Sequence, residues 1–314
     1  MQLAVYIHGS SGFSPKETID DYLSLATHYD SIGVHSLWFA DHLIRTPDPN
    51  KTALFEAWSL IAGLSRETTD IKFGTMVTPI TFRKFGPFVK QLVTVDHLSG
   101  GRIIAGLGAG WSYKEYDLFG VDFPSTKDRL DTLEETVQAL QMLWSSDDSV
   151  DFDGQHVQLQ QAYLKPQPVN GRIPILIGGG GERRTLRQVA KYADYSNFGG
   201  DLATIEHKLS VLAGHCDQVG RSFDAITPTS NRAIILGKTD AEVEEGITKY
   251  LARFKELGHQ PPSRDDFATT RLVGTIDEVV SQLGQLEDLG IQLPVLTVND
   301  SRTTELLGDL IDAV

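Results

Sequence analysis

The chain has 314 residues, of which 40% are hydrophobic and 22% charged, and its formal net charge at pH 7 is -14. This composition is ordinary for a globular protein and excludes a disordered or low-complexity chain. The excess of acidic side chains repels polyanions, so we expect a small-molecule substrate and no nucleic-acid partner.

Cysteine usage and apolar runs limit the compartment. The single cysteine, Cys216, cannot form an internal disulfide, and the spacing of the histidines does not indicate a metal site. The first residues, MQLAVYIHGSSG, lack the basic region and apolar run of a signal peptide, and no stretch of about 18 apolar residues is present to span a bilayer. We therefore expect a cytoplasmic protein that does not contact a membrane.

Segments of strand length alternate with segments of helical periodicity along the chain, which is typical of parallel β/α units. The expected strands are 2–8, 35–40, 71–77, 102–110, 173–181, 193–198, 226–237 and 293–298. The expected helices are 15–31, 54–66, 85–97, 126–144, 182–192, 201–219, 241–257, 276–289 and 303–313. Ser14 is the expected N-cap of the first helix, and residues 258–271 are expected to form a loop.

One segment, 145–171, interrupts this alternation and is expected to form a short hairpin that turns at Asp153 and Gly154. Eight strands, each followed by a helix, predict an α/β fold: a (β/α)8 TIM barrel in one domain, 1–314, with a short insertion after the fourth β/α unit. The turn after the first strand, HGSSG, does not match GxGxxG, so a doubly wound nicotinamide-binding fold is not expected.

The turn IGGGGERRT contains four consecutive glycines, Gly178, Gly179, Gly180 and Gly181, between a strand and a helix. Glycine lets the backbone approach a phosphate, and a helix N-terminus offers N–H donors and a positive dipole. Arg183 and Arg184 follow at once and can add positive charge. The turn therefore indicates a phosphate site, the alternative being a tight turn that only packs strand against helix.

Two further strand ends carry candidate site residues. GLGAGWSYKEY places Gly108, Gly110 and Trp111 after the fourth strand, where small residues leave space for a flat ring, although such a bend can also form without a ligand. WFADHL places Asp41 and His42 after the second strand, at the end of a barrel that carries catalysis, and histidine can act as general acid or base near neutral pH. The alternative role for this pair is helix capping.

Taken together, SLWFADHL, FGTMVTPITFR, LSGGRIIAGLGAGWSYKEYDLFG and PILIGGGGERRTLRQVAKYAD resemble the bacterial luciferase-like oxidoreductases, in the branch usually assigned to coenzyme F420. The resemblance implies a cofactor ring across the barrel mouth, with its phosphate in the glycine turn and with Asp41 and His42 beside the ring. It also implies a bulge at Thr75, Met76 and Val77 that contacts the ring and holds a cis peptide between Met76 and Val77.

At one position the chain departs from this pattern. The sugar-phosphate dehydrogenases of the group carry a catalytic glutamate where this chain has Trp111. We therefore do not expect a sugar phosphate as the substrate.

Three functions remain open. The first is hydride transfer between coenzyme F420 and an unidentified small organic substrate, with His42 as proton donor or acceptor. The second is an FMN-dependent monooxygenase that uses O2 and reduced flavin from a partner reductase. The third is a non-catalytic flavin-binding barrel. By resemblance we also expect a homodimer.

Overall fold

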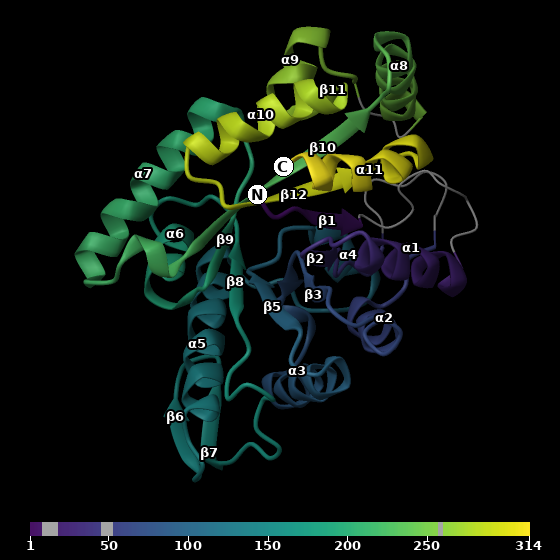
Figure 1. Ribbon diagram of the computed structural model, residues 1–314. Helices are drawn as coiled ribbons and strands as arrows, with labels where there is room; N and C mark the ends of the chain where they lie inside the picture. Colours follow the sequence, from purple (N-terminus) through teal and green to yellow (C-terminus); the bar gives the residue numbers. More distant parts are fainter. Residues whose placement is uncertain (8–17, 45–52, 257–259) are drawn as a thin grey trace.

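The computed structural model describes residues 1–7, 18–44, 53–256 and 260–314 (Figure 1). Parallel strands form a closed barrel, because β9, the last strand of the sheet order, pairs with β10 near its other end. Around the barrel the strands are β1 (Ala4–Ile7), β2 (Ser36–Phe39), β3 (Lys72–Thr75), β5 (Ile103–Gly108), β8 (Ile175–Gly178), β9 (Tyr195–Asn197), β10 (Thr227–Leu236) and β12 (Leu293–Val298). The predicted TIM barrel is thus confirmed.

Helices cover the outside of the barrel (Figure 1). They are α1 (Ile19–Ser31), α2 (Ala57–Leu64), α3 (Phe85–Ser99), α4 (Tyr113–Leu118), α5 (Thr126–Trp144), α6 (Thr185–Tyr192), α7 (Leu202–Val219), α8 (Asp240–Glu256), α9 (Arg264–Thr269), α10 (Ile276–Asp288) and α11 (Ser301–Ala313). Among the helices of the described residues, none combines the length and apolar character that a membrane span requires.

The strands bury both of their faces, because successive side chains point to opposite sides. Outward-facing side chains such as Leu37 and Ile177 join the helices in one large core. Inward-facing side chains such as Ala4, Trp38 and Leu176 form a second, smaller core inside the barrel. The lumen below the mouth is therefore filled, and only the ends of the strands are open for a site.

The insertion is the predicted hairpin, formed by the antiparallel strands β6 (Val150–Asp153) and β7 (Gln158–Ala162). It lies beside α5 at the lower end of Figure 1. Glu135 of α5 accepts hydrogen bonds from the backbone N–H groups of His156 at 2.7 Å and Val157 at 2.9 Å. These charge-assisted hydrogen bonds attach the hairpin to the helix.

Three local predictions differ from the structure. The segment expected to be a loop, 258–271, contains helix α9 and leads into a short strand, β11 (Arg271–Gly274), that pairs with β10. Strand three ends at Thr75, and extended backbone resumes in β4 (Thr78–Pro79) beside β5. Helix α1 begins after Thr18, which forms a capping box with Asp21. The predicted cap, Ser14, lies outside the described residues.

His35, just before β2, makes stability depend on pH. Its ring nitrogens lie 3.0 Å from Lys72 Nζ and 3.1 Å from Ser36 Oγ. Burial, and secondarily the charge of Lys72, lowers the pKa of His35 from 6.5 to about 4. The unfolded chain therefore binds a proton that the folded chain rejects. This group should cost the fold up to about 3 kcal/mol as the pH falls from about 7 to about 4.

Urea denaturation of the wild type and of His35→Gln at several pH values measures this effect. The free-energy difference between the two proteins should change in favour of the glutamine variant as the pH falls, because glutamine does not titrate. Parallel pH profiles for the two proteins would show that His35 titrates normally in the fold.

Candidate active site

The strand ends that carry the candidate residues are neighbours in the barrel. β2, β3, β5 and β8 follow one another in the sheet, and their parallel pairing brings their carboxyl ends to the same rim. Asp41 and His42 follow β2, the bulge follows β3, Trp111 follows β5, and the glycine turn follows β8. The sequence therefore places its candidates on one continuous side of the mouth.

His42 is held by a buried carboxylate. Its Nδ1 atom lies 2.7 Å from Oε1 of Glu115, and the backbone N–H of Leu43 donates to Oε2 of the same carboxylate at 2.8 Å. Glu115 lies on the short helix α4 and is 0% exposed. Burial alone would raise the pKa of Glu115, but the hydrogen bonds it accepts, led by that from His42, hold the pKa below its ordinary range.

Asp41 binds Arg83 and Thr78 and is not part of the contact between His42 and Glu115. It is 2% exposed and accepts two hydrogen bonds from Arg83, at 2.7 and 3.0 Å, and a third from Thr78 Oγ1 at 2.6 Å. Arg83 also donates to Glu56 at 2.5 Å. Two of these hydrogen bonds come from a guanidinium group and are charge-assisted. Asp41 thus stiffens the rim, which leaves His42 as the better candidate for proton transfer.

Glu115 and Arg83 complete these two pairs, and neither was among the residues singled out from the sequence. Both stand within quoted motifs, GWSYKEY and TPITFR. Their partners are 73 and 42 residues away, so local spacing does not reveal the pairing. The sequence did offer one signal. Glu115 follows the strand that ends at Gly108, and Arg83 follows the neighbouring strand, so both were candidates for the same rim.

The bulge after β3 has the geometry that the resemblance implies. The peptide bond between Met76 and Val77 is cis. The Thr75 hydroxyl lies 2.9 Å from the carbonyl oxygen of Gly106 and 2.9 Å from the hydroxyl of Thr78, so its side chain points into the structure. Thr75 itself is fully buried, and Val77 is only partly so.

The glycines of the neighbouring strands make room for this bulge. A Cβ atom on Gly106 would lie 1.6 Å from the carbonyl oxygen of Thr75. A Cβ atom on Gly108 or Gly178 would lie 2.4 or 2.7 Å from a methyl group of Val77. The space beside Gly108, expected to accept a ring directly, is thus filled by Val77, and the bulge is the surface that a ring can contact.

Trp111 forms the wall beside His42. Its ring meets the His42 ring edge to face, with centroids 5.9 Å apart, and the side chain is 69% exposed. Gly110 precedes it with a φ of +77°, and a Cβ atom there would lie 2.3 Å from the hydroxyl of Tyr116. The other tryptophans, Trp38, Trp58 and Trp144, are buried in the cores.

The glycine turn leaves backbone donors open. Gly179 has a φ of +123° and donates its N–H to Asn197 at 2.9 Å. Within the described part of the chain, the N–H groups of Gly180 and Gly181 have no hydrogen-bond acceptor, and α6 begins four residues later at Thr185. Unpartnered amides ahead of a helix fit a phosphate group.

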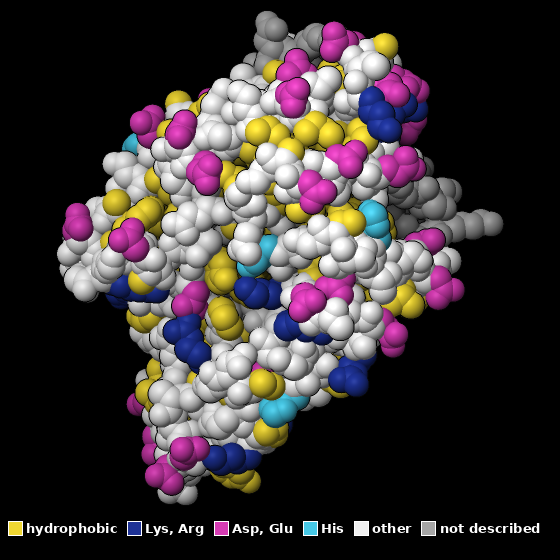
Figure 2. Space-filling view, in the orientation of Figure 1, with side chains coloured by type: hydrophobic (Ala, Val, Ile, Leu, Met, Phe, Trp, Pro, Cys, Tyr) yellow, Lys and Arg dark blue, Asp and Glu magenta, His cyan; other side chains and the backbone are white. Residues whose placement is uncertain are grey.

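The charges beside this turn are balanced locally. Glu182 accepts a hydrogen bond from Lys208 Nζ at 2.5 Å, and His207 Nε2 lies 3.2 Å from the same oxygen. Of the two predicted arginines, Arg184 pairs with Asp131 of α5, whereas Arg183 is exposed. Figure 2 shows acidic side chains mainly over the upper part of the face, where α8, α9 and α10 lie, with most lysines and arginines below. On this face the charges are therefore unevenly spread, and the net charge of -14 does not by itself exclude an anion at the turn.

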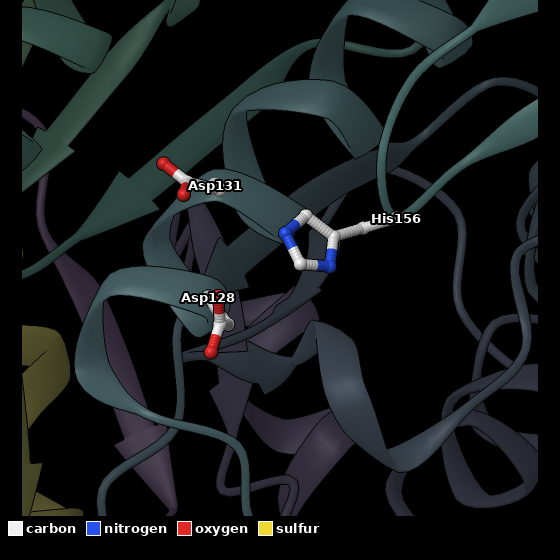
Figure 3. A group of neighbouring side chains, drawn as sticks. All are labelled: Asp128, Asp131 and His156. Atoms are coloured by element: carbon white, nitrogen blue, oxygen red, sulfur yellow. The ribbon is translucent and has the colours of Figure 1, made fainter.

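Figure 3 shows a second polar cluster, made of Asp128 and Asp131 of α5 with His156 of the hairpin. Their ligand atoms lie within 4.8 Å of one another. Asp131 is already paired with Lys127 at 2.6 Å and with Arg184, and Asp128 accepts from Ser125 at 2.6 Å. All three are partly exposed. These contacts account for the cluster as the junction of hairpin and helix, and we assign it no metal.

Comparison with known proteins agrees with the fold. The sequence model of the family described as luciferase-like monooxygenase matches residues 1–293. The F420-dependent glucose-6-phosphate dehydrogenase of Nocardia farcinica is 31% identical over 266 residues, which are 81% of this chain and 74% of that one. The enzyme of the same name from Amycolatopsis mediterranei is 29% identical over 198 residues, covering 62% and 55%.

The chain thus spans about half the length of several of the curated relatives it matches.

Among solved structures, an F420-dependent secondary alcohol dehydrogenase in complex with an F420-acetone adduct superposes with a TM-score of 0.82. The superposition covers 100% of this chain and 98% of that one at 19% identity, so it supports the fold.

Proposed function

Because the chain belongs to the luciferase-like monooxygenase family, we propose that it is a coenzyme F420-dependent oxidoreductase acting on a small organic substrate. The observation that carries the proposal is His42, held by the buried Glu115 on the same barrel rim as the open amides of the glycine turn. A titratable group and a turn with open amides on one rim are what a phosphorylated redox cofactor and a proton-coupled reaction require.

Each part of the rim has a task in this proposal. The N–H groups of Gly180 and Gly181 would hold the cofactor phosphate, and the bulge at Met76 and Val77 would support the ring. When bound, the deazaflavin supplies or accepts a hydride. His42 donates or accepts the proton that accompanies the hydride.

The residue at position 111, a tryptophan, narrows the class of substrate. It presents an apolar wall beside His42, at the position where the sugar-phosphate dehydrogenases of the group carry a glutamate. The carboxylate that contacts His42, that of Glu115, is occupied by its own hydrogen bonds. We therefore propose a substrate other than a sugar phosphate.

An FMN-dependent monooxygenase is the second candidate, favoured by the monooxygenase description of the matching family. In that case O2 and reduced flavin from a partner reductase would be needed. A non-catalytic flavin-binding barrel is the third. The same rim serves all three, because the candidates differ in the cofactor ring and in turnover and not in how a phosphate is held.

A titration separates these functions. We expect coenzyme F420 to bind more tightly than FMN, and the reduced F420 complex to be stable in air but oxidised on addition of a substrate from a panel of small carbonyl, imine and enoyl compounds. Rapid oxidation of a bound reduced FMN by O2, without F420 binding, would favour the monooxygenase. Tight binding without turnover across the panel would favour the binding protein.

A further inference from the structure

The contact between Glu115 and His42 determines more than the position of the ring. We propose that Glu115 is a positioning residue that keeps the proton of neutral His42 on Nδ1, so that Nε2 is the nitrogen that exchanges a proton with the substrate. The placement of the proton follows from the contacts and from the charge of Glu115. Its consequence for the reaction rests on the proposed function.

Both oxygens of the Glu115 carboxylate have assigned donors. Oε2 accepts the backbone N–H of Leu43 at 2.8 Å, and a backbone amide can only donate. Oε1 faces Nδ1 of His42 at 2.7 Å, which is the length of a charge-assisted hydrogen bond. The carboxylate is therefore oriented by the backbone on one side and presents an acceptor to the ring on the other.

The ionisation of Glu115 sets the direction of this hydrogen bond. A carboxylate has only acceptor sites, so Nδ1 of His42 must supply the hydrogen. A neutral imidazole carries one proton, and its second nitrogen then holds a lone pair. Nε2 can accept a proton in this tautomer, and Nδ1 cannot.

The charged group next to His42 in the chain is engaged elsewhere. The adjacent carboxylate, Asp41, is bound twice by Arg83, which also binds Glu56. The contact to Trp111 is an edge-to-face ring contact and involves no proton. Among the described charged groups around His42, Glu115 is the one that the structure places within hydrogen-bond distance of Nδ1.

The proton balance of the reaction fits this arrangement. In the reduction of a substrate double bond, the bound cofactor would supply a hydride to one atom, and His42 would supply a proton to the other. The proton leaves Nε2 of the His42 imidazolium, the N–H bond electrons remain on Nε2, and the ring keeps its Nδ1 proton toward Glu115. Water then returns a proton to Nε2, and in the oxidative direction each transfer is reversed.

The variant Glu115→Gln tests the inference. A glutamine side chain offers one acceptor oxygen where the carboxylate offered two, and its neighbours are the backbone N–H of Leu43, Nδ1 of His42 and the hydroxyl of Ser112, which can rotate. The oxygen should remain with the backbone amide, which cannot move, so the NH2 group should donate to Nδ1. The His42 proton should then shift to Nε2, and the ring should lose its ability to accept a proton there.

Nitrogen-15 NMR of the histidine side chains reads this tautomer directly, without cofactor or substrate. The chain has 9 histidines, and the signal lost in His42→Gln identifies the ring in question. In the wild type, with the ring neutral, we expect a protonated Nδ1 and an unprotonated Nε2, and in Glu115→Gln the reverse. Glu134→Gln is the matched control, because Glu134 binds Lys191 and Tyr192 and should leave the His42 signals unchanged.

Turnover gives the second readout. Glu115→Gln should lower kcat by about 10²-fold or more with the cofactor Kd nearly unchanged, and Glu115→Asp, which keeps the charge, should recover part of the loss. A wild-type His42 with its proton on Nε2 would overturn the inference, even if the glutamine variant does not fold. A wild-type tautomer as expected in a protein that binds neither cofactor would overturn the proposed function and leave the role of Glu115 standing.

Discussion

Replacing His42 with alanine should lower turnover by about 10²- to 10⁴-fold, while the cofactor Kd changes by less than about threefold. The ring lies beside the mouth and its Nδ1 contact is with Glu115 on α4, whereas the unpartnered amides that would hold the cofactor phosphate belong to the turn after β8. Removing the imidazole therefore removes a proton donor without removing a phosphate contact.

Stopped-flow oxidation of the reduced cofactor measures the first quantity, and equilibrium titration measures the second. His97→Ala is a matched control, because His97 is exposed and its recorded contact is with the carbonyl oxygen of Gln167. Equal losses of turnover and cofactor affinity in His42→Ala would show that His42 only supports the ring, and unchanged turnover would contradict its acid or base role.

The barrel could be predicted because the sequence pattern that defines each strand and helix lies within that element. Each β/α unit shows its own change from strand-length apolar run to helical period, and eight such units allow few architectures. α5 begins and ends at the predicted residues, and β12 does also, because strong apolar periodicity and a buried run define them. The hairpin followed from its alternation and from the turn at Gly154.

The elements that were missed depend on distant partners. β11 has only four residues, and it is a strand because β10 extends beyond the barrel rim and pairs Ala233 with Arg271. The break after Thr75 was expected only from the resemblance, since the apolar run over 71–77 reads as one continuous strand. Local propensity does not contain these tertiary contacts.

The candidate site also contains features that local sequence predicts and features that depend on distant partners. Glycine turns, His42 and Trp111 were predicted because residue type and position at a strand end suffice to nominate them. The roles within the rim were not predicted, because they depend on pairs. Asp41 was expected beside the cofactor as a catalytic group, and its contacts with Arg83 and Thr78 instead favour a structural role. Glu115 becomes visible only when α4 brings it to His42.

Gly106→Ala should destabilise the fold by about 3 kcal/mol or more and should weaken cofactor binding with it. The new Cβ atom would lie 1.6 Å from the carbonyl oxygen of Thr75, and this neighbour is backbone, which cannot rotate away. The strand around Gly106 is paired on both sides, with Ile104 against Gly74 and Leu107 against Thr78 on one side and Gly106 against Leu176 on the other. The bulge must therefore move, together with the hydrogen bond that joins Thr75 to the Gly106 carbonyl.

Chemical denaturation and cofactor titration on the same preparations measure both effects. Gly214→Ala in α7 is the control, because nothing lies within 4 Å of its added Cβ atom, and a helix interior gains about 0.5–1 kcal/mol from the exchange. Because Gly106 is distant in sequence from the glycine turn but supports the bulge, a variant that keeps wild-type stability would show that the bulge can shift freely. In that case the close packing of Gly106, Gly108 and Gly178 around residues 75–77 would not be what shapes the mouth, and the position of the ring would have to be set by the amides of the glycine turn alone.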